Sequence, residues 1–382
     1  MSRLTWRTAG ESHGSGLVAI LEGFPAGFEL DLARIDRDLA RRQGGYGRGG
    51  RMKIERDHAE VISGMRAGRT LGSPIALLIQ NKDQTIERLP VPTNPRPGHA
   101  DLAGCQKLGA RDPRAVLERA SARETAARVA LAAIARQLIE AFGVEVFAHV
   151  VELGGLRARA DAWDQAGDRR EELREASEFF GLDPAIEPAW RKLVDEAREA
   201  GDSLGGVFEV RARGVVPGLG SYNSGAERLT ARLGAALFSI PAIKGVEFGL
   251  GFDSARRPGS QVHDAIIPAG PQAKFGRFAR ASNRAGGLEG GMTTGEELVV
   301  RAAMKPIPTL RMGMDTVDFA TGAATRATYQ RSDVTSVPAA SVVGEAMVAL
   351  ELADAFLVKF AGDTLGELRD AYQAYQKRLT EL

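Results

Sequence analysis

The stretch that decides the fold is ASARETAARVALAAIARQLIEAF, residues 120–142. Alanine, leucine and arginine are strong helix formers, and Gly143 follows directly as a stop, so the sequence predicts one long helix here. Two further alanine-rich segments, residues 338–360 and 225–239, also predict helices. Small side chains let helix backbones approach closely, which helices enclosed between sheets require.

Short β-prone segments on both sides of these helices predict the flanking strands. They are residues 17–22, 59–65, 74–80, 144–153, 205–216, 243–252 and 297–306. Residues 32–43 predict one more helix, which begins after the cap residue Asp31 and ends at Gly44. We therefore expect an α+β fold in which strands flank long alanine-rich helices.

Residues 158–203 differ from the rest because acidic and basic residues alternate along them. This pattern predicts a solvated helical excursion without a functional site. No repeat of solenoid length and no low-complexity linker divides the sequence. We expect residues 1–382 to form one compact domain, with two fused halves as the alternative.

Composition limits the class of protein. The net charge of +1 and the 44% of apolar residues are typical of a globular protein and indicate no polyanionic partner. The single cysteine, Cys105, excludes an intramolecular disulfide and favours a reducing compartment, so we expect a cytoplasmic protein. The start, MSRLTWR, lacks the apolar region of a signal peptide, and the longest apolar run, residues 129–135, is too short for a bilayer span.

Glycine-rich segments contain the side chains best suited to chemistry, since glycine lets a backbone approach a ligand. The stretch TAGESHGSG, residues 8–16, contains His13, one of only five histidines. Residues 40–56, ARRQGGYGRGGRMKIER, combine arginine forks with glycines and would suit an anionic small molecule. A solvated charged loop and an RNA contact are the alternatives for this segment.

Three other segments are candidates. A proline-rich loop positions His99 within RPGHAD, residues 96–101, although a lone histidine is more often structural or exposed. Residues 118–124, ERASARE, are expected in the first turns of the long helix, where unpaired N–H groups attract anions; a plain capping box is the alternative. QRSDVTSVPAA, residues 330–340, places Asp333 just before a helix. No metal-ligand spacing, Walker A sequence or strand-borne GxGxxG pattern is present.

Taken together and in order, eight blocks resemble the chorismate synthases. The blocks are AGESHG, RRQGGYGRGGRM, RPGHAD, RASARETAARV, IPAIKGVEFG, NRAGGLEGGMTTG, AAMKPIPT and QRSDVTSVPAA. The resemblance runs from about residue 5 to the C-terminal helix. It implies a β-α-β sandwich in which the helices lie between antiparallel sheets. It also implies a lyase that converts 5-enolpyruvylshikimate 3-phosphate to chorismate by 1,4-anti-elimination of phosphate, with reduced FMN and no net redox change, as the seventh step of the shikimate pathway.

The resemblance assigns roles to individual positions. The catalytic residues would be His13 as general acid to the departing phosphate, His99 at the flavin ring, and Asp333 as proton acceptor by way of flavin N5. Substrate anions would be bound by Arg42, Arg48, Arg51, Arg96, Arg123 and Arg331. FMN would be held by Arg119, Ala120, Ser121, Pro241, Ala242, Gly290, Lys305, Pro306, Ile307, Pro308, Thr309 and Arg331. Arg42 and Arg48 also match positions assigned to NADP in the family.

Further expectations follow from the same resemblance. Family members often have an amide residue where Pro241 stands, so at this position only a backbone contact to the flavin is expected. The chain resembles the short bacterial type, a cytoplasmic homotetramer without its own flavin reductase, so reduced FMN would come from an external reductant and NADP(H) would act only indirectly. No metal, nucleic acid or membrane is expected. The alternative function, RNA binding through GGYGRGGRMK, needs stacking aromatics, and only Tyr46 is available there.

Overall fold

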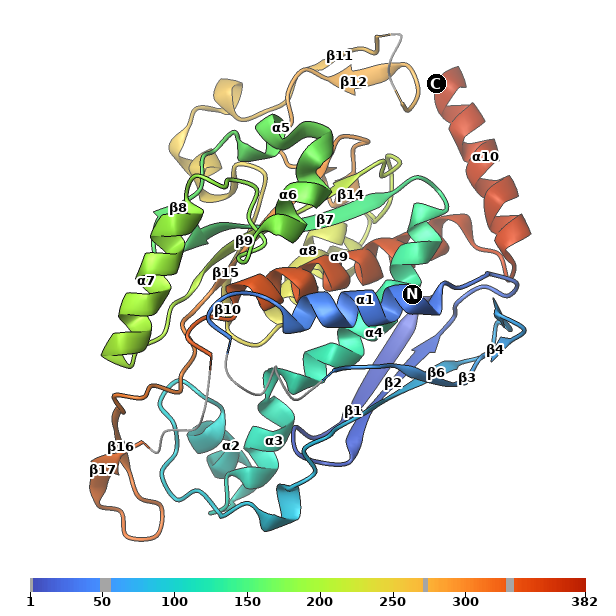
Figure 1. The fold of residues 1–382 in the computed structure, drawn as a ribbon. Helices are drawn as coiled ribbons and strands as arrows, with labels where there is room; N and C mark the ends of the chain where they lie inside the picture. Colours follow the sequence, from blue (N-terminus) through green and yellow to red (C-terminus); the bar gives the residue numbers. More distant parts are fainter. Residues whose placement is uncertain (1–2, 49–55, 271–273, 328–332) are drawn as a thin grey trace.

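The structure, a computed structural model, describes residues 3–48, 56–270, 274–327 and 333–382. Two sheets lie on opposite sides of a layer of helices (Figure 1). Two of the predicted site residues, Arg51 and Arg331, lie outside the described residues.

The first sheet is antiparallel and has the strand order β1-β2-β6-β3. Its strands are β1 (Thr5–Gly10), β2 (Gly16–Glu22), β6 (Ile75–Gln80) and β3 (Glu60–Ser63). Along β2, Leu17 and Leu21 are buried while Val18 and Ile20 are exposed, because successive side chains of a strand point to opposite faces. One face of this sheet therefore covers the core.

The second sheet, also antiparallel, has the order β10-β15-β9-β7-β8. Its strands are β10 (Ile243–Phe248), β15 (Leu298–Met304), β9 (Gly206–Arg213), β7 (Glu145–Leu153) and β8 (Leu156–Arg157). The predicted strands are confirmed except at residues 59–65. There Gly64 separates β3 from β4 (Met65–Arg66), and β4 pairs with β5 (Arg69–Thr70) in a hairpin of its own.

The central helices are α4 (Thr125–Glu140), α9 (Val337–Phe360), α1 (Leu32–Gln43) and α8 (Leu229–Phe238). Helix α4 packs on β2 and β6, α9 packs on β7 and β9, and the two helices pack on each other. The predicted arrangement of alanine-rich helices between antiparallel sheets is thus confirmed, with a helical layer two helices deep between the sheets (Figure 1). The caps expected for α1, Asp31 and Gly44, are both present.

Gly344 is a point of close approach between α9 and the second sheet. A Cβ at this position would lie 2.2 Å from the ring of Phe208, which is fully buried. We expect Gly344→Ala to lower the free energy of unfolding by about 1–3 kcal/mol, because the ring has no space into which to move. Urea denaturation measures the change. Gly234→Ala in α8 is the control: a Cβ there meets nothing within 4 Å, so alanine should stabilise by up to about 1 kcal/mol. Equal midpoints for the two variants would contradict this packing.

The prediction of one helix over residues 120–142 is wrong at its start. The chain forms α3 (Arg114–Ala120), a 3-10 turn over Ala122–Glu124 and only then α4. Ser121 has extended backbone angles, and its hydroxyl accepts a hydrogen bond from the N–H of Arg123. A serine cap is a local alternative to continued helix, so it divides a sequence whose helix propensity is otherwise high. The expected helix at 225–239 is likewise a 3-10 turn followed by α8.

The remaining elements surround the sandwich. The helices are α2 (Asp101–Leu108), α5 (Ala162–Ala166), α6 (Arg170–Ala176), α7 (Glu187–Ala200) and α10 (Leu365–Glu381). The small hairpins are β4 (Met65–Arg66) with β5 (Arg69–Thr70), β11 (Ile266–Pro268) with β12 (Phe278–Arg280), β13 (Leu288–Glu289) with β14 (Met292–Thr293), and β16 (Asp315–Val317) with β17 (Ala324–Arg326). Helices α2 and α3 lie together at one end of the molecule, near the end of β1 (Figure 1).

The expectation of a solvated excursion at residues 158–203 is wrong in part. Its helices α5, α6 and α7 are present, but Trp163, Phe179 and Trp190 are buried. These aromatic side chains form two small clusters against β7. The alternating charges conceal this packing because the buried aromatics occupy only a few positions of the segment: Trp163 in α5, Trp190 in α7, and Phe179 between α6 and α7.

Among the described residues, none of the helices combines the length and hydrophobicity needed to cross a bilayer.

Candidate active site

His13 lies in the loop between β1 and β2 and is fixed by α3. Its Nδ1 atom lies 2.9 and 3.1 Å from the two carboxylate oxygens of Glu118, and its backbone N–H donates to the same carboxylate. The next residue back, Ser12, donates its N–H to the carbonyl of Glu118 and lies 3.2 Å, oxygen to oxygen, from the hydroxyl of Ser121. These hydrogen bonds fix the position of the loop and of the His13 imidazole relative to α3.

Arg123 and Arg42 lie in the interior beside this loop. Arg123 donates to both oxygens of Asp57 and, through Nε, to Asn81. The amide of Asn81 in turn donates to the carbonyls of Glu11 and Gly14, which flank His13. Arg123 is thus joined by hydrogen bonds to the His13 loop.

Arg42, in the last turn of α1, approaches the same carboxylate from the other side. It donates to Thr125 and to the carbonyl of Ala122, and its Nη1 lies 3.7 Å from Asp57. Nη1 of Arg42 and Nη2 of Arg123 are buried, and neither has a hydrogen-bond acceptor among the described residues. The guanidinium groups of Arg42 and Arg123 therefore share the carboxylate of Asp57, and each has one nitrogen that can donate to a ligand.

Arg48 and Asp333 extend this group of charges. They form an ion pair of 2.7 Å, and Ser336 donates its hydroxyl to Asp333. Burial and the neighbouring charges of Arg48 and Arg123 lower the pKa of Arg42 to about 10, although Asp57 opposes them. We call Arg42, Arg48 and Arg123, with Asp57 and Asp333, the arginine cluster; its cations outnumber its anions.

His99 lies in a second group, at the start of α2. Its Nδ1 contacts Asp101, which also accepts hydrogen bonds from Nε and Nη2 of Arg96. The carbonyl of Gly98 accepts a hydrogen bond of 2.7 Å from Lys305 Nζ. Burial first, and then the charge of Lys244, lower the pKa of Lys305.

The segment 305–309 connects this second group to others. The N–H of Lys305 donates to the carbonyl of Ala242, which has a positive φ of 70° and follows Pro241. The carbonyl of Ile307 accepts from Ser203, while the N–H of the adjacent Leu204 donates to the carbonyl of Val334, next to Asp333. Ser203 and Leu204, where the charged segment 158–203 ends, therefore connect the group around His99 with the arginine cluster.

Gly290 is not brought to either group. It stands in the exposed turn between β13 and β14, whose described contacts are with residues 216–220, Leu229 and Arg280. Two cavities are described, and His13, His99 and Asp333 line neither of them. The larger, of about 570 Å³, is lined by Arg119 together with Trp6, Arg128, Glu351 and others, and Arg119 donates there to the carbonyl of Thr8.

Tyr46, in the described part of the glycine-rich basic segment, is held by α7. The hydroxyl of Tyr46 donates to Asp195, and the guanidinium groups of Arg191 and Arg198 lie over its ring at 4.6 and 5.4 Å from the centroid. Tyr46, the one aromatic in the sequence of that segment, is therefore covered by α7, which counts against the RNA-binding alternative. Among the described residues, no set of three His, Cys, Asp or Glu side chains could hold a metal ion.

Comparison with known proteins identifies the family. The sequence profile of the chorismate synthases matches residues 4–357. The chain is 52% identical to a chorismate synthase of Geobacter sulfurreducens over 97% of its own length and 98% of the relative's. It is also 52% identical to one of Rubrobacter xylanophilus, covering 99% and 97%. A crystal structure of chorismate synthase superposes with a TM-score of 0.81 at 41% identity, covering 100% of both chains. The chain belongs to the chorismate synthase family.

The geometry adds residues that the chorismate synthase resemblance did not single out. Glu118, Asp57 and Asn81 connect the predicted residues to one another and are all buried. Asp101 does the same for His99 and Arg96. Asp101 is the last residue of the block RPGHAD, and Glu118 directly precedes the block RASARETAARV. Their position at these blocks is the one sequence signal from which they could have been predicted. Nothing in the sequence distinguishes Asp57 from an exposed aspartate.

Proposed function

We propose that this chain has the activity of its family: it converts 5-enolpyruvylshikimate 3-phosphate to chorismate and phosphate by 1,4-anti-elimination and needs reduced FMN. The breaking of a C–O bond releases phosphate, and the loss of a C–H proton completes the new double bond, so no net oxidation takes place. The product places the enzyme in aromatic amino acid biosynthesis.

The arginine cluster is the observation that carries the proposal. Its buried donors on Arg42 and Arg123 have no described acceptor, and an unpaired buried donor is unfavourable. A carboxylate or phosphate supplies the missing acceptors and the missing negative charge. The substrate has two carboxylates and a phosphate, which is the chemistry that this cluster favours. Arg96, and Arg51 and Arg331 outside the described residues, are proposed to complete the substrate site.

The residues proposed for the flavin fit an anionic cofactor in part. Arg119 and Ser121 lie beside the His13 loop, and Lys305 with Ala242 lies beside the His99 loop, so each imidazole loop has a cation next to it. When bound, reduced FMN would supply electron density to the ring from which phosphate departs. Pro306, Ile307, Pro308 and Thr309 would contribute backbone contacts, as would Ala120 and Pro241. Gly290 has no support from its position in this chain.

The chain's own residues supply the proton chemistry. His13, protonated, would donate from Nε2 to the oxygen of the departing phosphate, since Nδ1 is occupied by Glu118. Asp333 would take up the proton that the elimination releases, and Arg48 beside it favours the ionised carboxylate that this role needs. His99, held by Asp101 and Arg96, would favour the correct protonation state of the bound flavin ring.

We extend the proposal to the assembly and the supply of reduced flavin. Val18, Ile20 and Ile62 are exposed on the outer face of the first sheet, and Ile266 and Phe278 on the β11–β12 hairpin. Exposed apolar side chains grouped in this way are typical of subunit contacts, which supports a homotetramer. We also propose a cytoplasmic location, a separate flavin reductant, and NADP(H) only as the indirect source of electrons. Light scattering after size exclusion tests the assembly.

The function is tested by adding the substrate and reduced FMN to the folded protein without oxygen and following phosphate release. We expect steady release that stops when FMN is omitted or left oxidised. No release from folded protein with reduced FMN would refute the proposal. Flavin binding with and without substrate is the second measurement, and we expect each ligand to strengthen the binding of the other.

Asp333 can be tested separately. We expect Asp333→Ala to lower kcat about a hundredfold and to leave the protein folded, because a general base contributes at least about that factor. Asp333→Asn is the matched variant: its side chain can still accept the hydrogen bond from Ser336 but cannot take up a proton, so it should be equally slow. A wild-type rate in either variant would remove Asp333 from the proton transfer.

A further inference from the structure

We infer that Glu118 is a positioning residue for His13: its carboxylate keeps the imidazole proton on Nδ1 and so presents Nε2 as the atom that exchanges a proton with the ligand. The inference deepens the proposed function and rests on it for the catalytic consequence. The orientation itself follows from contacts within the chain.

The carboxylate of Glu118 contacts His13 at two levels. Nδ1 of the ring lies 2.9 Å from Oε2 and 3.1 Å from Oε1, and the backbone N–H of His13 donates to Oε2 at 2.9 Å. The main chains are joined as well, because the N–H of Ser12 donates to the carbonyl of Glu118, and the carbonyl of His13 accepts from Ile86. Neither the ring nor the loop that carries it can rotate away without breaking several hydrogen bonds.

The charge of Glu118 decides which partner donates. Its side chain is 1% exposed, and burial would raise its pKa, but the hydrogen bonds from His13 and then from Arg114 exceed that effect and leave the pKa of Glu118 below its ordinary value. An ionised carboxylate has no proton to give, so Nδ1 must be the donor. In the neutral ring this leaves Nε2 as the basic nitrogen, and in the cation it makes Nε2 the acidic one.

The Nε2 side of the ring is the accessible one. The His13 side chain retains 23% exposure, and its Nε2 lies 3.9 Å from the carboxylate of Asp83, which is 39% exposed. Arg114 stands behind Glu118, at 3.2 Å from Oε1. Of the two carboxylates described beside the imidazole, that of Glu118 at Nδ1 is buried and that of Asp83 near Nε2 is partly exposed.

A parallel arrangement at His99 supports this reading of Glu118. Its Nδ1 contacts the buried carboxylate of Asp101. Asp101 begins α2 and Glu118 lies near the end of α3, and the two helices pack closely where Gly104 meets Val116. One pair of helices thus supplies a buried carboxylate to each imidazole.

The test is the tautomer of His13 in Glu118→Gln, measured by ¹⁵N NMR of the ligand-free protein labelled at histidine and held at a pH where the ring is neutral. His13→Ala assigns the signal. We expect the unmodified protein to show Nδ1 protonated and Nε2 bare, and we expect the variant to lose this preference. Glu140→Gln, at the end of α4 and paired with Arg34, is the control and should keep it.

Activity provides the second readout. We expect Glu118→Gln to lower kcat at least about tenfold, by less than His13→Ala does, with the KM for the substrate nearly unchanged and a displaced pH profile. An unchanged tautomer and pH profile in a folded variant would overturn the inference. If the variant does not fold, the tautomer of His13 in the unmodified protein still tests the inference. A neutral His13 ring protonated on Nε2 would overturn it. Absence of phosphate release from the unmodified protein would instead refute the proposed function, and the tautomer would still be measurable.

Discussion

His13→Ala is expected to lower kcat by about two to four orders of magnitude, the usual contribution of a positioned general acid. The His13 imidazole is anchored at Nδ1 by Glu118, and its side chain retains 23% exposure. Without it, phosphate must leave as a more highly charged anion. Flavin binding should be nearly intact, because the alanine removes none of the residues proposed to hold the flavin.

Single-turnover measurements under anaerobic conditions separate the chemical step from product release, and flavin affinity is measured on the same preparation. His58→Ala is the matched control, since the side chain of His58 is 74% exposed and pairs only with Asp36 among the contacts described. Its kcat should equal that of the unmodified protein. Equal rates for His13→Ala and the unmodified protein would exclude a proton-transfer role for His13.

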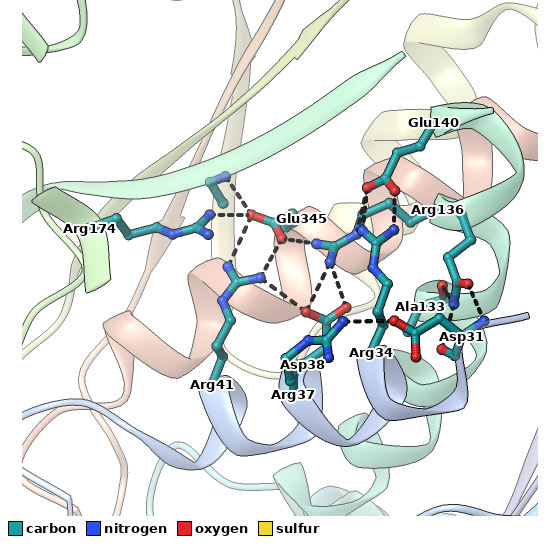
Figure 2. A network of polar contacts seen from close by, with 12 residues as sticks. Asp31, Arg34, Arg37, Asp38, Arg41, Ala133, Arg136, Glu140, Arg174 and Glu345 are labelled. Atoms are coloured by element: carbon teal, nitrogen blue, oxygen red, sulfur yellow. Dashed lines mark hydrogen bonds and ion pairs between the residues drawn. The ribbon is translucent and has the colours of Figure 1, made fainter. Parts of the chain in front are cut away.

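Glu345→Ala is expected to destabilise the fold by about 3–5 kcal/mol, the cost of removing one partner from a buried ion pair. Figure 2 shows Glu345, on α9, at the centre of a network of polar contacts. Its carboxylate accepts hydrogen bonds from Arg41, Arg136 and Arg174 and from the backbone N–H of Ala148. The side chain is 2% exposed, so its loss leaves buried guanidinium groups without their shared anion.

Urea denaturation at neutral pH measures this loss. Glu140→Ala is the control because Glu140 binds Arg34 and Arg136 near the surface, where an ion pair contributes about 1 kcal/mol or less. If Glu345→Ala and Glu140→Ala are equally stable, the buried network does not stabilise the fold. Arg41 adjoins Arg42, so we also expect Glu345→Ala to weaken substrate binding by releasing the end of α1.

The same carboxylate predicts a dependence on pH. Burial would raise the pKa of Glu345, but Arg41, Arg174 and Arg136 overcome it and hold the pKa at about 2, against 4.5 for a free glutamate. A carboxylate whose pKa is lowered on folding stabilises the protein above its unfolded-state pKa and ceases to do so as the pH falls through the folded-state value. The unmodified protein should therefore lose stability between about pH 4.5 and pH 2 in a component that Glu345→Ala lacks.

Local sequence was sufficient to predict the central helices and most strands of the two main sheets. The alanine-rich helices, the capped α1 and these strands follow from spacing and propensity over a few residues, which are short-range properties, whereas β1, α2 and the small hairpins were not predicted. The motifs likewise predicted the loops that carry His13, His99 and Asp333. The same local reasoning did not detect the division at Ser121, where a hydroxyl cap outweighs helix propensity.

Only the tertiary structure decided which charges meet. Arg48 pairs with Asp333, Arg123 with Asp57, and His13 with Glu118, across long separations in the sequence. It also decided that the charged segment 158–203 buries its aromatic side chains and that Asp195 of this segment accepts a hydrogen bond from Tyr46. The physical reason is that an ion pair depends on distance and burial after folding, and neither quantity is set by the neighbours of a residue along the chain.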